Sequence, residues 1–411
     1  MTSRFSFLFA VFFIVFSVGS FAQDDSSRFR LDSHFIDQQL QAASKQIRLL
    51  QQATPVDKFP KTFVNNKHEF SSSDWWCSGF FPGTLFLLSE ATDDQSLAAF
   101  AIEKLTYLEK EQFNKGTHDL GFMLYCSFGN ALRLTRDSAR YVPILVNGAA
   151  SLASRYNQNT KTIRSWDHNK WKFPVIIDNM MNLEFLFEVA KLSGNPDLAK
   201  IGKSHANTTL KNHFRADHSS YHVIDYDPHS GQVLAKQTHQ GAADASAWAR
   251  GQAWGLYGFV MAFRETNDSL YLQKAKHIAN FILDHPNMPE DLIPYWDFDT
   301  DKFQDRQDPS NNKLRDASAA AVIATSLLEL SLYVDGQESA HYLRKAEAII
   351  TTLSSEQYFA KYGENGGFLL KHSVGALPMN SEVDVPLSYA DYYYVEALVR
   401  YRRALLGEAI I

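Results

Sequence analysis

Two aspartates stand at the start of predicted buried helices, where a carboxyl group can take part in proton transfer. Asp178 follows the apolar stretch 173–177 and precedes a segment rich in Met, Leu and Phe. Desolvation in such a place raises a carboxyl pKa, which suits a group that must give a proton near neutrality. Asp119 opens another buried helix, whose N-terminus favours the ionised form. Two carboxyls in different surroundings are typical of an acid and a stabilising anion, although each could also be only a helix N-cap.

An arginine lies between two tryptophans in segment 248–255, which reads WARGQAWG. A buried Arg250 is costly unless its charge is paired, so it either binds a carboxylate or sulfate of a ligand or bridges to an internal Asp. Trp254 and Trp76 could stack on sugar faces, or they could belong to the core. These residues are compatible with an anionic carbohydrate ligand.

The elements that position these residues are mainly helical. Phe35, Leu40, Ile47 and Leu50 recur with helical spacing and predict an amphipathic helix, and 97–108 predicts another. Segments 254–263 and 317–330 are apolar nearly all round, which indicates buried helices. Strand-like sequence is minor: 221–226 and 232–235 flank Pro-His-Ser-Gly and predict a short hairpin.

The buried helices share a polar or aromatic opening that runs straight into apolar residues. Such openings recur every 45 to 75 residues, roughly, and suggest six copies of a helix pair. A closed toroid satisfies this pattern, so we predict an all-α (α/α)6 barrel, a six-hairpin toroid with a minor β-hairpin. All six openings then meet at one concave mouth, where ligand pockets are expected. The openings are 74–79, 118–122, 178–182, 246–251, 315–318 and 388–391.

The chain is predicted to be exported. Residues 1–22 have the charged, apolar and small-residue order of a signal peptide, with cleavage expected before Gln23. No low-complexity linker divides 23–411, which predicts a single catalytic domain in a periplasmic or secreted protein. The net charge of −6, or −7 without Arg4, argues against a nucleic-acid binder. No later apolar run is long enough to cross a membrane, so no membrane partner is expected after cleavage.

The sequence contains no paired metal-ligand spacing, phosphate-binding loop or dinucleotide motif, so neither a metal nor a cofactor is predicted. His222, His239 and Gln240 lie between the third and fourth openings without such spacing. Cys77 and Cys126 lie in apolar helix-like contexts, which favours two buried free thiols over a disulfide.

Motifs along nearly the whole mature chain, in order, resemble the unsaturated glucuronyl hydrolases, glycoside hydrolase family 88. A related family acting on unsaturated rhamnogalacturonyl ends shares the barrel, but it typically has Asn where Gln252 stands. The resemblance therefore favours the glucuronyl group, with the rhamnogalacturonyl type as the alternative. The motifs are WWCSGFFPG (75–83), HDLGFM (118–123), IIDNMMNL (176–183), YHVIDYDP (221–228), WARGQAWG (248–255), RDASAAA (315–321) and NSEVDVPLSYADYY (380–393).

The resemblance implies an exo-acting enzyme on lyase-generated oligosaccharides of glycosaminoglycan or ulvan type. A carboxylic acid protonates C4 of the terminal unsaturated uronic acid, water adds at C5, and the hemiketal opens to release a keto uronic acid. Asp178 matches the acid/base position and Asp119 the second essential carboxylate. The implied substrate-binding residues are Trp76, His118, Trp166 (or Trp171 in its place), His222, Gln240, Arg250 and Trp254, and in a C-terminal loop Ser373, Asn380 and Ser381, with Lys371 as the nearby cation.

Two other classes stay open from the residues alone. One is a conventional glycosidase whose two carboxylates act at the anomeric carbon. The other is a non-catalytic oligosaccharide-binding protein in which Asp119 and Asp178 are only caps. The sequence does not distinguish chondroitin, heparin, hyaluronan, gellan and ulvan as the parent polysaccharide.

Overall fold

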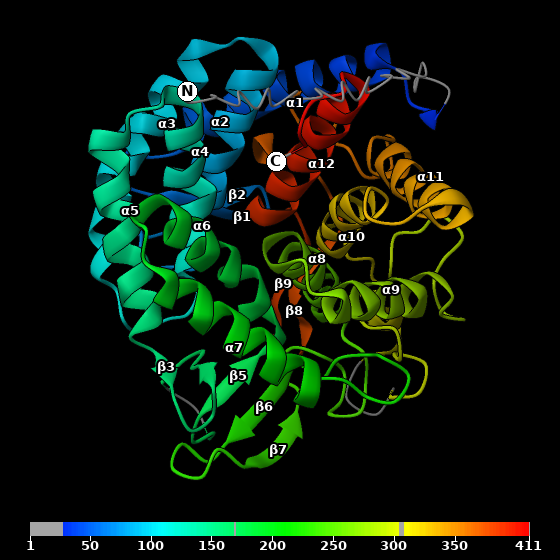
Figure 1. Cartoon of the computed structure of the whole chain (residues 1–411). Helices are drawn as coiled ribbons and strands as arrows, with labels where there is room; N and C mark the ends of the chain where they lie inside the picture. The colour runs from blue at the N-terminus through cyan, green and yellow to red at the C-terminus, as the bar shows by residue number, and fades with distance from the viewer. Residues whose placement is uncertain (1–27, 168–169, 304–307, 411) are drawn as a thin grey trace, which may run out of the picture.

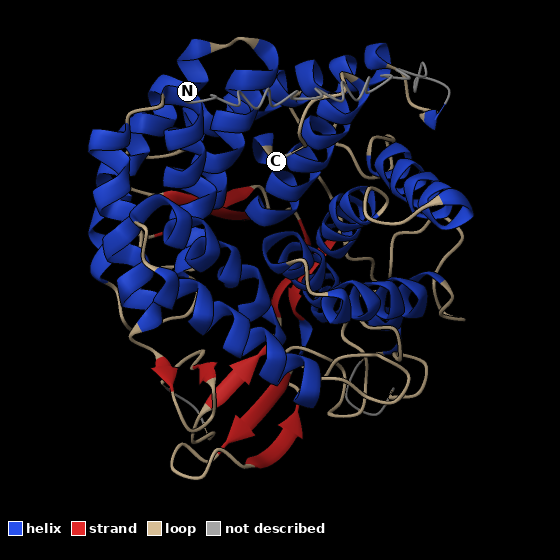
Figure 2. Cartoon of the chain, in the orientation of Figure 1, coloured by secondary structure: helices blue, strands red, loops and turns tan. Residues whose placement is uncertain are grey.

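The computed structural model describes residues 28–167, 170–303 and 308–410. The predicted signal peptide, 1–22, lies outside these residues. Helices make up most of the described chain, and the strands are short (Figures 1 and 2).

Six helical segments form an inner ring, and each begins within or directly beside one of the predicted openings. Each segment packs against the next, and the last packs against the first, which closes the ring. The segments are α2 (Phe80–Thr92), η3 with α4 (Gly121–Gly129, Asn130–Thr135), η4 with α6 (Ile177–Asn182, Leu183–Ser193), α8 (Ala249–Thr266), α10 (Ala317–Leu330) and α12 (Ser388–Leu405).

Six outer helices alternate with the inner segments along the chain. Five of them begin at an Asp or Asn whose side chain accepts a hydrogen bond from a backbone N–H of the first turn, so their starts are set locally. This double ring confirms the predicted (α/α)6 barrel. The outer helices are α1 (Ser33–Ala53), α3 (Gln95–Leu108), α5 (Ser138–Ala153), α7 (Pro196–Asn212), α9 (Ser269–Leu283) and α11 (Gly336–Leu353).

The predicted β-hairpin is confirmed and belongs to a larger sheet. β6 (Val223–Tyr226) pairs antiparallel with β7 (Val233–Gln237), and β5 (Pro174–Ile176) pairs with the other edge of β6. This sheet lies at the lower edge of Figure 2. Because β5 runs directly into η4, the sheet fixes where Asp178 enters the barrel.

Three smaller strand pairs complete the sheet structure of the described residues. β3 (Tyr156–Asn157) pairs with β4 (Thr162–Ile163). β1 (Phe59–Val64) pairs with β2 (Lys67–Ser71), and β8 (Ser373–Ala376) pairs with β9 (Ser381–Val385). β1 also packs against β9, which places the two hairpins side by side.

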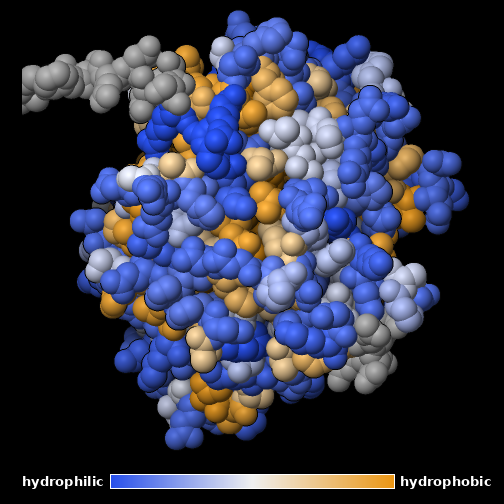
Figure 3. All heavy atoms as spheres, turned by 90° about the vertical axis from the view of Figure 1, so that its right-hand side faces the viewer, coloured by the Kyte–Doolittle hydropathy of each residue, from blue (hydrophilic) through white to orange (hydrophobic). Residues whose placement is uncertain are grey.

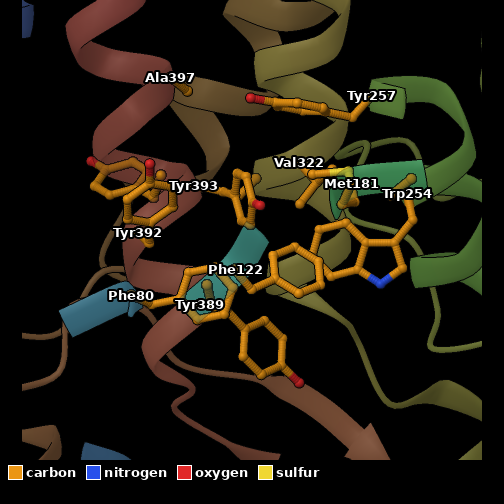
Figure 4. Close-up of a cluster of buried hydrophobic side chains, with 14 of the residues drawn as sticks. Phe80, Phe122, Met181, Trp254, Tyr257, Val322, Tyr389, Tyr392, Tyr393 and Ala397 are labelled. Atoms are coloured by element: carbon orange, nitrogen blue, oxygen red, sulfur yellow. The ribbon is translucent and has the colours of Figure 1, made fainter. Parts of the chain in front are cut away.

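The core lies inside the inner ring and is rich in aromatic rings. Trp254 packs against Phe122 and Tyr393, with ring centroids 5.4 and 5.5 Å apart (Figure 4). In this view the Trp254 nitrogen and the Tyr389 hydroxyl point to one side, and the Tyr257 hydroxyl lies on the other. The packed rings therefore separate the two ends of the barrel.

The two cysteines are free thiols, as predicted. Cys77 is buried, whereas Cys126 is half-buried. Burial raises the pKa of both thiols well above the ordinary value, which makes the reactive thiolate form scarce at neutral pH.

A buried ion-pair network joins four of the inner helices to one another. Arg400 lies 2.7 Å from Glu329 and 3.2 Å from Glu396, and Arg264 binds both Glu329 and Glu184. These five residues cross-link α6, α8, α10 and α12. A cavity of about 480 Å³ lies beside them, and its lining includes none of the predicted site residues.

The side of the molecule that forms the right of Figure 1 is predominantly hydrophilic, with scattered hydrophobic residues (Figure 3). Within the described ranges, none of the helices has the length and apolar character needed to span a bilayer.

Candidate functional site

The six openings meet at one end of the barrel, as predicted. Trp76 of the first opening packs against Phe122 of the second and Tyr389 of the sixth, with centroids 5.6 and 4.8 Å apart. Arg250 of the fourth opening lies over the Tyr389 ring at 5.3 Å and binds Asp316 of the fifth at 3.0 Å. This end of the barrel is called the mouth below.

The second and third openings approach each other closely, which brings both predicted acids to the mouth. A β-carbon on Gly121 would lie 2.7 Å from Asn182 Oδ1, so position 121 has no room for a side chain. The next backbone amide, of Phe122, donates to the same oxygen at 3.0 Å. The helix from Gly121 to Gly129 is π-helical, a form that often occurs at functional sites.

Asp178 is the second residue of the 3-10 segment η4 and not its N-cap, which is Ile176. The cap interpretation is therefore wrong for this residue. Its side chain is 13% exposed. Burial raises the pKa of Asp178 to about 7, with Arg250 lowering it and Asp119 raising it further. The carboxyl group therefore exchanges a proton readily near neutral pH.

Asp119 lies two residues before the second inner helix, and its side chain is 18% exposed. His118 Nε2 lies 3.2 Å from one of its carboxylate oxygens, and the Thr117 hydroxyl donates to the other at 2.8 Å. The N-cap of the helix is Leu120, so the cap interpretation is wrong here as well. Burial lowers the pKa of His118, which keeps its imidazole neutral at neutral pH.

His222 is buried beside Asp178 and its tautomer is defined by the backbone. The amides of His239 and Gln240 both donate to His222 Nδ1, each at 3.1 Å. A ring nitrogen that accepts hydrogen bonds carries no proton, so the proton of the neutral ring is on Nε2. Nε2 lies 3.7 Å from Asp178 Oδ2. His222 therefore presents an N–H donor to the predicted acid.

We expect His222 to be neutral and protonated on Nε2 throughout the neutral pH range, because burial holds its pKa well below the ordinary value. NMR of the ¹⁵N-histidine-labelled protein measures this directly, with His222→Asn identifying the signal. The Nδ1 resonance should have the shift of an unprotonated nitrogen. A protonated Nδ1, or titration of the ring near pH 6.5, would contradict this assignment.

The loop that holds His222 is itself anchored by a buried acid. Asp297 accepts hydrogen bonds from the Ala242 amide at 2.9 Å and from the Ser246 hydroxyl at 2.7 Å. Burial raises the pKa of Asp297 to about 6. This support was not predicted, because Asp297 lies outside every opening and no motif marks it.

Arg250 forms the bridge to an internal Asp, which was one of the two alternatives that the sequence left open. Its guanidinium binds Asp316 and the carbonyl oxygens of Val374 and Gly375, and the side chain is fully buried. These bonds involve both terminal nitrogens. In this structure Arg250 therefore fixes β8 and places a positive charge near Asp178, and its predicted contact with the substrate stays a prediction.

The tryptophans differ in how much of each ring is accessible. Trp254 is fully buried, so its ring faces cannot stack on a sugar in this structure, and Trp76 is half-buried. Trp166 is half-buried and packs against His239 at 5.7 Å. Trp171 is buried behind them, and its nitrogen donates to Gln237. Accessibility thus favours Trp166 over Trp171 as the ring that can contact a ligand.

The predicted residues of the C-terminal loop are not brought together. Ser373 is fully buried at the start of β8, whereas Asn380 is exposed and Ser381 half-buried at the turn into β9. Lys371 donates to the Glu356 carbonyl oxygen at 2.7 Å. Gln240, by contrast, joins the mouth, because its side-chain amide donates to the Gly375 carbonyl oxygen at 3.3 Å.

Several buried polar atoms at the mouth have no hydrogen-bond partner within the described part of the chain. Buried polar groups are nearly always bonded, so these atoms can form hydrogen bonds to a polar ligand at the mouth. Tyr389 and Ser388 were not predicted as site residues, although their SYAD opening resembled the other five. The atoms are His222 Nε2, Tyr389 Oη and Ser388 Oγ.

An (α/α)6 barrel with two carboxylic acids and aromatic rings at its mouth has the architecture of a glycoside hydrolase. The chain belongs to glycoside hydrolase family 88: the model described as Glycosyl Hydrolase Family 88 matches residues 55–410. This confirms the resemblance drawn from the motifs.

Individual proteins agree with this assignment. An unsaturated glucuronyl hydrolase of Formosa agariphila is 46% identical over 341 residues, which cover 82% of each chain. The crystal structure of an unsaturated glucuronyl hydrolase specific for heparin is 48% identical, with a TM-score of 0.85 over 92% of this chain and 98% of that one. A mutant unsaturated glucuronyl hydrolase from Streptococcus agalactiae, complexed with dGlcA-GalNAc6S, is 26% identical with a TM-score of 0.77, over 92% of this chain and 96% of that one.

Proposed function

We propose that this enzyme removes the terminal unsaturated uronic acid from oligosaccharides by hydrating its C4=C5 double bond. The observation that carries the proposal is Asp178, a carboxyl group at the mouth whose pKa is about 7. The names of the relatives support the same substrate class, since they are unsaturated glucuronyl hydrolases and one holds an unsaturated disaccharide.

In the proposed reaction Asp178 gives its proton to C4, and positive charge develops on C5 and the ring oxygen. The Asp178 carboxylate then takes a proton from the water that adds at C5. The resulting hemiketal opens by breaking the bond between C5 and the ring oxygen, which leaves a ketone at C5 and a hemiacetal at C1. The hemiacetal then breaks the bond to the next sugar, which leaves with a proton as an alcohol, and the product is a keto uronic acid with an aldehyde at C1. Asp178 ends the cycle protonated, so one group serves as acid and base.

Neighbouring residues assist this transfer. Asp119 adds negative charge that raises the pKa of Asp178 and stabilises the developing positive charge on the sugar ring. The Nε2–H of His222, 3.7 Å from Asp178 Oδ2, can stabilise the carboxylate once its proton has left. Trp76, half-buried at the mouth, offers a ring face for the sugar.

The test is the ultraviolet absorbance of unsaturated disaccharides, because hydration removes the conjugated double bond. We expect the absorbance to fall on incubation with the enzyme. Unchanged absorbance across disaccharides from several lyases, together with release of a saturated uronic acid from a chromogenic uronoside, would instead support a conventional glycosidase.

The pH dependence follows from the raised pKa of Asp178. The protonated form is the donor, so we expect kcat/KM to fall as pH rises through about 7. In Asp119→Asn the charge that raises this pKa is gone, and the alkaline limb of the residual activity should move to lower pH. If the alkaline limb stays at the same pH in Asp119→Asn, it does not report the titration of Asp178.

We also propose that the protein works outside the cytoplasm on the products of polysaccharide lyases, since β-elimination is the class of reaction that creates this double bond. The basis for export is the signal-peptide pattern of residues 1–22. N-terminal sequencing of protein from a periplasmic or culture fraction should begin at Gln23. A chain that keeps residues 1–22 would contradict export by cleavage.

A further inference from the structure

A charged pair that was not predicted lies beside the mouth. Lys61 of β1 and Glu382 of β9 come from opposite parts of the sequence, and Lys61 Nζ lies 3.6 Å from Glu382 Oε1. Only 10% of the Glu382 side chain is exposed. Burial raises the pKa of Glu382, whereas Lys61 and Arg250 lower it. Lys61 is thus a cation neutralised by an adjacent carboxylate.

The Glu382 carboxylate lies against the wall of the mouth. A β-carbon on Gly375 would be 2.4 Å from Glu382 Oε2, so only glycine leaves space for the carboxylate. The carbonyl oxygen of Gly375 accepts hydrogen bonds from Arg250 and Gln240. Glu382 is therefore separated by a single backbone unit from residues predicted to hold the unsaturated sugar.

The backbone at Glu382 is strained, which is independent of its ion pair. Its φ is +56°, in the left-handed region that glutamate rarely adopts. Asn380 and Asp384 on the same hairpin also have positive φ, but those residue types tolerate it better. Strain of this kind gathers at ligand sites, where the surrounding structure maintains it.

Exposure increases outward from Glu382 toward solvent. The Lys61 side chain is 21% exposed, and Trp75, whose ring lies 4.9 Å from Lys61 Nζ, is 41% exposed. An exo-acting enzyme holds the terminal sugar innermost, and the rest of the oligosaccharide extends toward solvent. Lys61, Glu382 and Trp75 contact one another in this order of exposure, and Trp75 directly precedes Trp76 of the mouth, so they lie where such an oligosaccharide would leave the mouth.

We infer that Lys61, Glu382 and Trp75 form the subsite for the leaving sugar, and that Glu382 selects a leaving sugar without sulfate facing this pair. The inference rests on the proposed function. A sulfate placed here meets a carboxylate that solvent screens poorly, and Lys61 already neutralises that carboxylate. A hydroxyl or amide group of an unsulfated sugar can instead donate a hydrogen bond to Glu382.

The test is the ratio of kcat/KM for each monosulfated unsaturated disaccharide to that for its unsulfated counterpart. Glu382→Gln keeps the shape and frees Lys61 to bind sulfate, so for at least one sulfated isomer this ratio should rise about tenfold. Lys61→Met leaves the carboxylate uncompensated and should lower the same ratio by a similar factor. The double variant should return near the wild-type ratio.

Asp384→Asn is the matched control. Asp384 lies on the same hairpin, also has positive φ and pairs with His372 at 2.7 Å, but it is exposed. Its ratio should not change. Because each ratio compares two substrates on the same folded molecules, it does not depend on how much of a variant folds.

Two results would overturn the inference. One is an unchanged ratio for every isomer in Glu382→Gln and in Lys61→Met. The other is a rise in the double variant as large as in Glu382→Gln, because Lys61 would then play no part. Failure of the proposed function looks different: the wild-type enzyme would consume neither the sulfated nor the unsulfated disaccharides.

Discussion

Replacing Asp178 by Asn is expected to lower kcat by about 10³-fold with a much smaller change in KM, because positioned proton transfer contributes about 10² to 10⁴. Asparagine has nearly the same shape and keeps the contacts that bind the sugar, but it cannot donate an acidic proton. Loss of ultraviolet absorbance from a saturating unsaturated disaccharide gives kcat. Activity within tenfold of wild type would exclude Asp178 as the acid.

The loss of activity in Asp178→Asn must be distinguished from a loss of folded protein. Burial raises the pKa of Asp178 to about 7, so wild-type stability is highest with the carboxyl protonated and decreases as pH rises through about 7. The neutral asparagine avoids this decrease, and above pH 7 the variant should be at least as stable as the wild type. Asp225→Asn is the control, because Asp225 is a buried acid of β6 that accepts the Phe173 amide. It should retain most of the activity.

Replacing Asp316 by Ala is expected to lower the free energy of unfolding by about 4 kcal/mol, since breaking a buried ion pair leaves a charge uncompensated. Asp316 is fully buried and lies 3.0 Å from the buried Arg250. It also caps α10 by accepting the amides of Ser318 and Ala319. Urea denaturation at neutral pH measures the change.

A helix N-cap that makes no ion pair within the described residues separates the contribution of the cap from that of the ion pair with Arg250. Asp137 caps α5 through the Arg140 amide and is exposed, so Asp137→Ala should cost only about 1 kcal/mol. Equal losses in the two variants would mean that the bridge to Arg250 contributes nothing beyond the cap.

The sequence was sufficient to predict the barrel, because its helices are encoded locally. The all-apolar segment 317–330 predicted a buried helix, and α10 has these bounds with every residue buried. The six openings predicted the mouth, because each combines a polar or aromatic start with an apolar continuation. The β5 strand was not predicted, since three apolar residues do not distinguish a strand from a helix.

Pairings between distant residues were beyond the sequence. From the sequence, Arg250 could bind either a ligand anion or an internal Asp. Only the fold shows that its guanidinium donates hydrogen bonds to Asp316 and to two β8 carbonyl oxygens. Lys61 and Glu382 meet only because β1 packs against β9. Arg264 and Arg400 carried a signal that was available, since a charge in an apolar helix needs a buried partner.

The hydrogen bonds from Arg250 to the β8 backbone affect how the substrate range of the enzyme can change. Arg250 holds carbonyl oxygens, which every residue type possesses, so the anchoring depends on the backbone path of β8 and, apart from Gly375, not on its side chains. The neighbouring β9 is then free to vary while the catalytic end of the barrel keeps its geometry. We therefore expect that the β8–β9 hairpin can be exchanged between relatives. Grafting it should transfer the preference for the leaving sugar without changing the geometry around Asp178.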